Sequence, residues 1–208
     1  MAHVDLHAAE ISQRGSGTLV RIRRAGPEDV VLILAMHDRL SADTIHARYF
    51  SSYTPSYEEI ERICHLQPEE GAAWVAVAGS AGEMVVGIAY YMITHSQRPI
   101  KAEVAFLVED AFQGQGVGQR LFRHLSSHAL AQGIHSLHAY VDASNRSMMR
   151  VFARGGFPYT STISYGLRDV QMLLDPGEAK ASRRWVIPET ITMKWPGAAE
   201  ASTYARAS

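Results

Sequence analysis

The chain has 208 residues, of which 47% are hydrophobic, and a formal net charge of −1. This length is enough for one domain with a full hydrophobic core. The balanced charge excludes a general attraction to nucleic acid or to an anionic membrane, and the single cysteine, Cys64, excludes an internal disulfide. No run reaches the roughly 18 apolar residues of a membrane span. We therefore expect a cytoplasmic protein, either a monomer or a homodimer.

Hydrophobic periodicity and capping residues predict the helices and strands. Ser56 and Glu59 form a capping-box pair in front of one helix. The strongest helical pattern places Val117, Leu121 and Leu125 four residues apart. In chain order, we predict a strand over residues 19–23, helices over 27–40, 41–50 and 57–66, strands over 74–78, 84–92 and 100–108, a helix that follows a glycine turn and ends before Gly133, a strand around 137–141, a helix over 145–154, and strands over 160–165 and 170–174.

The order of these elements predicts the fold class and the extent of the domain. A hairpin followed by a strand–helix–strand unit gives a mixed α/β (α+β) sheet with helices on both faces. The domain is expected to cover residues 18–175. Residues 1–17 are predicted to be a flexible lead-in. Residues 176–208 are predicted to be a C-terminal extension and tail, because they are rich in Ala and Ser towards their end.

A glycine-rich turn lies between the strand over residues 100–108 and the strongly amphipathic helix. Its sequence is Gln113-Gly-Gln-Gly-Val-Gly118. Glycines let the backbone turn sharply and approach a ligand, and the helix N-terminus behind them favours an anion, so a pyrophosphate site is predicted. A Walker A loop would need Gly-Lys-Ser/Thr, and a dinucleotide fingerprint would need glycine at Leu121, so both are excluded. A glycine turn that binds nothing is the remaining alternative.

This segment resembles the GNAT superfamily of N-acetyltransferases, whose signature is Gln/Arg-x-x-Gly-x-Gly/Ala. Gln113, Gly116 and Gly118 match the signature, and the runs over residues 104–108 and 151–157 resemble two further conserved blocks. The resemblance extends over residues 19–174. It implies a mostly antiparallel central sheet that splays between its fourth and fifth strands, with acetyl-CoA as co-substrate and no metal.

The resemblance also implies which residues bind acetyl-CoA. Backbone groups of the fourth strand would bond to the pantetheine arm, and backbone N–H groups of the turn would hold the pyrophosphate. Asn145 would bond to pantetheine, although a plain helix cap explains this residue equally well. The implied set is Phe106, Leu107, Val108, Gln113, Gly114, Gln115, Gly116, Val117, Gly118, Gln119 and Asn145.

A narrower resemblance concerns bacterial protein lysine acetyltransferases of the Pat type. Residues 40–44, 48–50 and 102–106 carry it, and in those enzymes a glutamate at the position of Glu103 is the proposed general base. Partial burial of Glu103 would raise its pKa into a useful range. The alternative is a solvated charge paired with Lys101 or Arg98. One departure is Phe152, which stands where many GNAT members have a tyrosine that protonates the leaving thiolate.

Three functions remain open at this point. The first is transfer of an acetyl group from acetyl-CoA to a primary amine such as a protein lysine, by direct attack in a ternary complex. The second is acetylation of a small-molecule amine, and the third is a non-catalytic acetyl-CoA sensor.

His124 and His128 have a spacing able to bind zinc, but a surface pair is favoured because no third ligand is evident. Glu109 and Asp110 are expected to be loop charges.

Overall fold

The computed structural model describes residues 19–79 and 83–174 as a seven-stranded sheet with helices. The predicted lead-in over residues 1–17 and the extension over 176–208 lie outside the described residues. The strands are β1 (Val20–Arg24), β2 (Gly71–Ala78), β3 (Met84–His95), β4 (Ile100–Val108), β5 (Ile134–Asp142), β6 (Tyr159–Ser164) and β7 (Leu167–Leu173). The α-helices are α1 (Val30–His37), α2 (Ala42–Tyr49), α3 (Tyr57–Cys64), α4 (Val117–Ala131) and α5 (Arg146–Arg154), with 3₁₀ turns η1 (Pro27–Asp29) and η2 (Asp110–Phe112).

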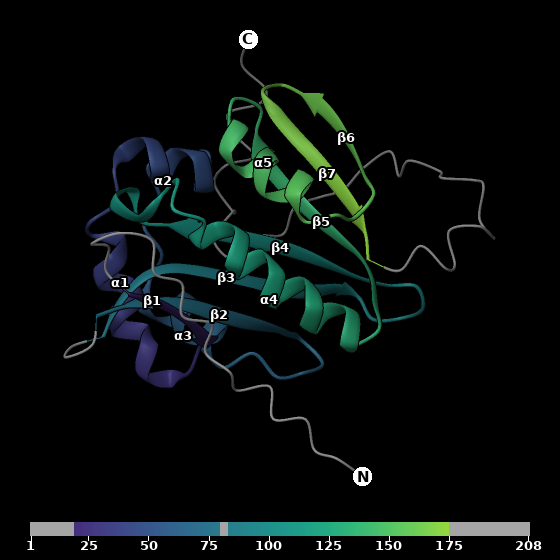
Figure 1. Cartoon of the computed structure of the whole chain (residues 1–208). Coiled ribbons are helices and arrows are strands. Elements are labelled where there is room, and N and C mark those ends of the chain that lie inside the picture. The colour runs from purple at the N-terminus through teal and green to yellow at the C-terminus, as the bar shows by residue number, and fades with distance from the viewer. Residues whose placement is uncertain (1–18, 80–82, 175–208) are drawn as a thin grey trace. The chain divides into compact units, whose positions relative to one another are not determined.

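The sheet has the strand order β1-β2-β3-β4-β5-β7-β6. All neighbouring strands are antiparallel except β4 and β5, which are parallel. Helix α4 crosses one face, over β1 to β5, while α1 and α3 pack on β3 and β2 and α2 packs on β4 and β5 (Figure 1). The predicted mixed, mostly antiparallel sheet with helices on both faces is therefore confirmed.

The parallel pair β4–β5 is hydrogen-bonded along only part of its length. Pairing runs from Ile100↔Ile134 to Glu103↔His138 and then ends. Beyond this point β4 continues to pair with β3, and β5 continues to pair with β7. The two strands thus separate after Glu103, which is the splay that the family resemblance implied.

The main hydrophobic core lies between the sheet and α4. The predicted stripe is buried, with Leu121 and Leu125 fully inaccessible to solvent. The rings of Phe106, Phe122 and Phe152 contact one another at the end of α4 that faces the splay. This packing fixes the start of α4 relative to the C-terminal half of β4.

Two predicted features differ in detail from the structure. The helix expected over residues 27–40 begins as the 3₁₀ turn η1 and becomes α-helical only at Val30. At this junction the buried Asp29 carboxylate accepts hydrogen bonds from Arg23 and from the Gly26 amide.

His128, expected to be one of a surface pair, is instead in contact with the core. Its Nδ1 lies 3.0 Å from the Tyr91 hydroxyl, and its ring packs edge-on against Trp74.

Helix α2 has no buried residue and is held mainly by polar contacts at its two ends. At its start, Asp110 accepts hydrogen bonds from the Ser41 amide (3.0 Å), the Ser41 hydroxyl (2.6 Å) and the Thr44 hydroxyl (2.7 Å). Gln113 Nε2 in turn donates to Thr44 Oγ1 and to the Val108 carbonyl, both at 3.0 Å. These bonds tie α2 to the segment that leads into the glycine turn.

The interpretation of Glu109 as a loop charge is wrong, whereas Asp110 is an exposed charge in the turn η2. Glu109 is buried and accepts from Arg39 Nη2 at 2.8 Å, so it is part of an ion pair between the end of β4 and the segment after α1. Burial of Asp110 opposes its ionisation, but the hydrogen bonds from Ser41 and Thr44 lower the pKa of its carboxyl. Both carboxylates therefore accept hydrogen bonds from the segment between α1 and α2 or from the first turn of α2.

A Thr44→Val variant tests whether these polar contacts hold α2 in place. Valine has nearly the same shape but removes the hydroxyl that bridges Asp110 and Gln113. We expect amide hydrogen exchange in α2 to become faster by a factor equivalent to about 1–2 kcal/mol, with exchange in the sheet unchanged. Thr162→Val, at an exposed position of β6, is the matched control. Unchanged exchange in α2 would mean that other contacts position this helix.

Candidate active site

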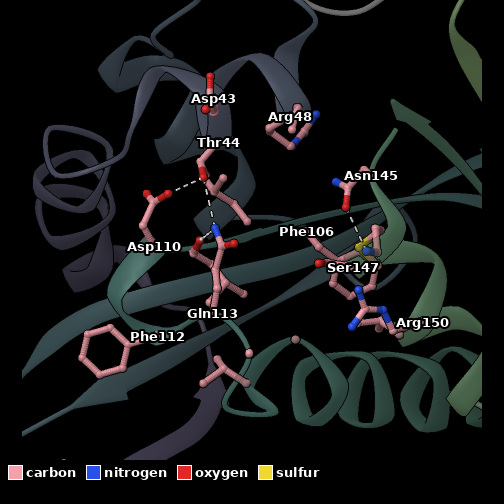
Figure 2. Close-up of a pocket in the computed structure, with 18 of the residues that line it drawn as sticks. Asp43, Thr44, Arg48, Phe106, Asp110, Phe112, Gln113, Asn145, Ser147 and Arg150 are labelled. Carbon is pink, nitrogen blue, oxygen red and sulfur yellow. Dashed lines mark hydrogen bonds between the residues drawn. The ribbon is translucent and has the colours of Figure 1, made fainter. Parts of the chain in front are cut away.

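A cavity of about 710 Å³ opens at the splay between β4 and β5. One wall is α2, the floor is the C-terminal half of β4 with the glycine turn, and the far wall is the loop after β5 with α5. Figure 2 shows Arg48 on the α2 side and Asn145 and Arg150 on the α5 side of this opening. The separated strands thus lead directly to the N-terminus of α4.

The glycine turn has the geometry of an anion site. Gly114 and Gly116 have φ values of 71° and 83°, in the left-handed region that side chains disfavour. A Cβ at either position would meet no atom within 4 Å, so glycine is required there by the backbone rather than by crowding. Gly116 is the N-cap of the 15-residue helix α4, whose first amides have no carbonyl within the helix to bond. These amides and the helix dipole favour a negatively charged group.

All the predicted cofactor residues except Gln115 line this cavity. Gln115 instead donates from Nε2 to the Ala111 carbonyl at 2.7 Å, which closes the turn. The amide nitrogen of the Gln113 side chain is likewise occupied, because it donates to Thr44 and to the Val108 carbonyl. The side chains of the two glutamines therefore shape the turn.

Asn145 acts as the cap of α5. Its Oδ1 accepts a hydrogen bond from the Met148 amide at 2.9 Å. Figure 2 shows its amide nitrogen on the other side, turned towards the opening. The capping interpretation is thus correct for the oxygen, while the nitrogen takes no part in the cap.

Glu103 lies at the closed end of the splay and is not among the residues that line the cavity. It is half-buried on the sheet face opposite α4, since Val104 and Phe106 on the same strand face that helix. Burial raises the pKa of Glu103, the Arg48 charge lowers it, and the Asp169 charge raises it. None of the ion pairs between described residues includes Glu103, so the alternative pairing with Lys101 or Arg98 is not formed.

Arg48 is a site residue whose role the sequence did not indicate. It lies in the cavity wall, donates from Nη2 to the Tyr90 hydroxyl at 2.7 Å, and has its guanidinium 4.8 Å from the centre of the Tyr49 ring. Arg48 belongs to the Pat-like run over residues 48–50, which was the available signal. Its electrostatic effect on Glu103 depends on the fold and could not be inferred from spacing.

Other arginines divide between binding and structural positions. Arg150 and Arg154 line the cavity from α5, where they could meet phosphates. Arg120 donates to the Val20 carbonyl at 2.9 Å and so anchors α4 to β1. Arg154 was missed because nothing in the sequence separates it from an ordinary charge at the end of a helix.

Phe152 cannot supply a proton, and the structure gives it a packing role. Its side chain is 1% exposed and lies within the Phe106 and Phe122 cluster. Tyr159, which lies near Phe152 in the sequence, is exposed on β6 and does not line the cavity, so it does not replace the missing donor there.

Over the described ranges, 19–79 and 83–174, no helix is both long and apolar enough to span a membrane. Within the same ranges, no group of three or more His, Cys, Asp or Glu side chains is arranged to hold a metal ion.

Comparisons with known proteins agree with this geometry. The family model described as Acetyltransferase (GNAT) family matches residues 37–157. Acetyltransferase Pat of Mycolicibacterium smegmatis is 27% identical over 141 residues, which are 68% of this chain but only 42% of that protein. The acetyltransferase PA5475 of Pseudomonas aeruginosa is 27% identical over 143 residues, which cover 68% of this chain and 76% of that protein.

Two solved structures show the same fold. The GNAT domain of S. lividans PAT has a TM-score of 0.69 and 24% identity, covering 82% of this chain and 99% of that one. The Salmonella typhimurium protein yncA, solved with its cofactor acetyl-CoA, has a TM-score of 0.61 and 22% identity, covering 75% and 94%. With the family model matching more than half of its residues, the chain belongs to the GNAT family of acetyltransferases and is an acyltransferase enzyme.

Proposed function

We propose that this enzyme transfers an acetyl group from acetyl-CoA to a primary amine, with a protein lysine as the favoured acceptor, by direct attack in a ternary complex. The observation that carries the proposal is the continuity of the cavity. It extends from the anion site at the start of α4 along the unpaired edge of β4, and Glu103 stands where the two strands meet.

The residues present fit acetyl-CoA. Backbone amides between Gln113 and Gln119 would hold the pyrophosphate, with Arg150 and Arg154 near enough to meet further phosphate charge. Beyond Glu103, β4 no longer pairs with β5, so backbone groups of Phe106, Leu107 and Val108 can bond to the amides of a pantetheine arm lying in the gap. The Asn145 amide nitrogen would donate to the same arm.

Glu103 has the environment of a general base. A lysine amine has a solution pKa of about 10.4, so the acceptor enters mostly as an ammonium and must lose a proton before its nitrogen can attack. A carboxylate whose pKa is raised by burial accepts that proton, directly or through one water, more effectively than a fully solvated one.

The transfer itself exchanges one bond for another. The amine nitrogen forms a bond to the thioester carbonyl carbon, and the carbon–sulfur bond breaks as CoA leaves as a thiolate. The nitrogen becomes positively charged on attack and loses its second proton to water, which leaves a neutral amide. A backbone N–H of β4 would stabilise the oxyanion that forms in between. Because Phe152 has no proton to give, the thiolate takes its proton from solvent.

The proposed acceptor class is supported by the resemblance to Pat-type enzymes. The likeness to Acetyltransferase Pat favours a protein lysine over a small-molecule amine. The test is a screen with labelled acetyl-CoA against intact bacterial proteins, spermidine and an aminoglycoside. Labelled protein lysines would support the proposal. Label only on the small amines would overturn the acceptor assignment, and tight acetyl-CoA binding without transfer to any amine would indicate a sensor.

Gly118 provides a matched pair of variants for the cofactor site. A Cβ at Gly118 would meet Val151 and Val108 side chains at 3.5 and 3.9 Å, which is ordinary contact, so both variants should fold. Gly118→Asp places a negative charge beside the predicted pyrophosphate, and we expect acetyl-CoA affinity measured by calorimetry to fall about 100-fold or more. Gly118→Ala should change affinity less than about fivefold. Equal affinity of the two variants would contradict a pyrophosphate at this position.

Glu103→Gln tests the general base. The amide cannot accept the proton, so we expect kcat to fall by about 10² to 10⁴, with acetyl-CoA affinity unchanged since Glu103 lies outside the cavity lining. In the wild type, kcat should rise with pH as Glu103 ionises, at a pH above that of an ordinary glutamate because its pKa is raised. This limb should disappear from the pH–rate profile of the variant. A variant that keeps the wild-type kcat would remove Glu103 from the mechanism.

A further inference from the structure

The sheet face around Glu103 carries charges from three separate elements. Glu103 on β4 is next to His138 on β5 in the parallel register, and Tyr140, two residues further, is opposite Asp169 on β7. Because side chains alternate along a strand, these four residues share one face. Arg48 reaches the same face from α2 through its bond to Tyr90, and the Glu103 charge contributes to the raised pKa of Tyr90.

Asp169 is the member of this group that lacks an explained partner. Its Oδ1 is shielded from solvent and has no hydrogen-bond partner among the described residues. A shielded carboxylate oxygen without a donor is costly, and a cationic donor is the partner that compensates it best. Asp169 is paired with Tyr140, two residues after the His138 that is paired with Glu103, so it lies close to the closed end of the splay, and its charge acts on all three of these residues.

We propose that Asp169 binds the acceptor and that Arg48 is a positioning residue, with the two opposite charges on either side of Glu103. This inference rests on the proposed function. Asp169 binds the ammonium of the incoming acceptor and selects cationic amines, while Arg48, fixed by Tyr90 and Tyr49, keeps Glu103 as the carboxylate that takes the proton. The two charges act on Glu103 from different elements, and neither residue takes the proton itself.

The charges that face Glu103 predict opposite effects of the two residues on its titration. The ionisable groups around it are Arg48 from α2, Tyr90 from β3, Lys101 on β4, His138 and Tyr140 from β5, and Asp169 from β7. Burial lowers the pKa of His138, which favours its neutral form. Removing the Asp169 charge should lower the pKa of Glu103, and removing the Arg48 charge should raise it.

The experiment compares Asp169→Asn and Arg48→Gln with the wild type, using Nα-acetyl-lysine amide as acceptor and spermidine as a second probe. For Asp169→Asn we expect KM for the amine to rise about tenfold or more, with the acidic limb of the kcat profile moved to lower pH. For Arg48→Gln we expect that limb to move to higher pH, and Arg48→Lys should return it towards the wild-type position. Asp38→Asn, an exposed aspartate after α1, is the matched control and should change neither quantity.

A second readout needs no acceptor. Carbon-13 NMR of labelled glutamate, with Glu103→Gln to assign the signal, follows the Glu103 carboxyl directly, and its pKa should move in the same two opposite directions. Shifts of the same sign in both variants, no shift in either, or an unchanged KM in Asp169→Asn would overturn the inference. A wild-type enzyme that acetylates neither probe would instead count against the proposed amine transfer, while the NMR titration would still decide the charge arrangement.

Discussion

The limited pairing of β4 with β5 is the constraint on which the site depends. Four residue pairs hold the two strands together, and after Glu103↔His138 each strand pairs only on its other side. Unpaired backbone groups in a protein interior need a partner, so an extended, amide-containing ligand is the natural occupant of the gap. The same divergence directs the open end of the gap at the N-terminus of α4, where an anion is favoured.

Helix α2 links the two halves of this site, mainly by polar contacts. Its first turn is bonded to Asp110 and, through Thr44, to Gln113 beside the anion site, while Arg48 near its end reaches Tyr90 beside Glu103. An element without buried apolar residues belongs to the less stable part of a fold. A ligand that orders the glycine turn would therefore also reduce the mobility of α2, which forms the wall on the proposed acceptor side.

Local signals in the sequence predicted most of the fold and the cofactor side of the site. The glycine turn needs particular φ values at Gly114 and Gly116, and the α4 stripe needs a fixed spacing, so both are visible without the structure. Glu109, Asp169 and Arg48 were misjudged or missed because their environments arise from residues far away in the chain. The Glu109–Arg39 pair, for example, joins residues 70 positions apart. Such pairings depend on sheet register, which no local pattern specifies.

The packing of Phe152 agrees with the proposal that the proton transfer takes place on the other face of the sheet. A tyrosine hydroxyl at a position that is 1% exposed would need a hydrogen-bond partner, but the neighbours of Phe152 are the apolar rings of Phe106 and Phe122. Phe152 is part of the hydrophobic core and stabilises the junction of α4, α5 and β4. Its ring has no hydroxyl that could protonate the leaving thiolate. Thiols are acidic enough to leave as thiolates near neutral pH. The demanding proton transfer is therefore removal from the acceptor ammonium, and the charged groups that could assist it are those on the Glu103 face.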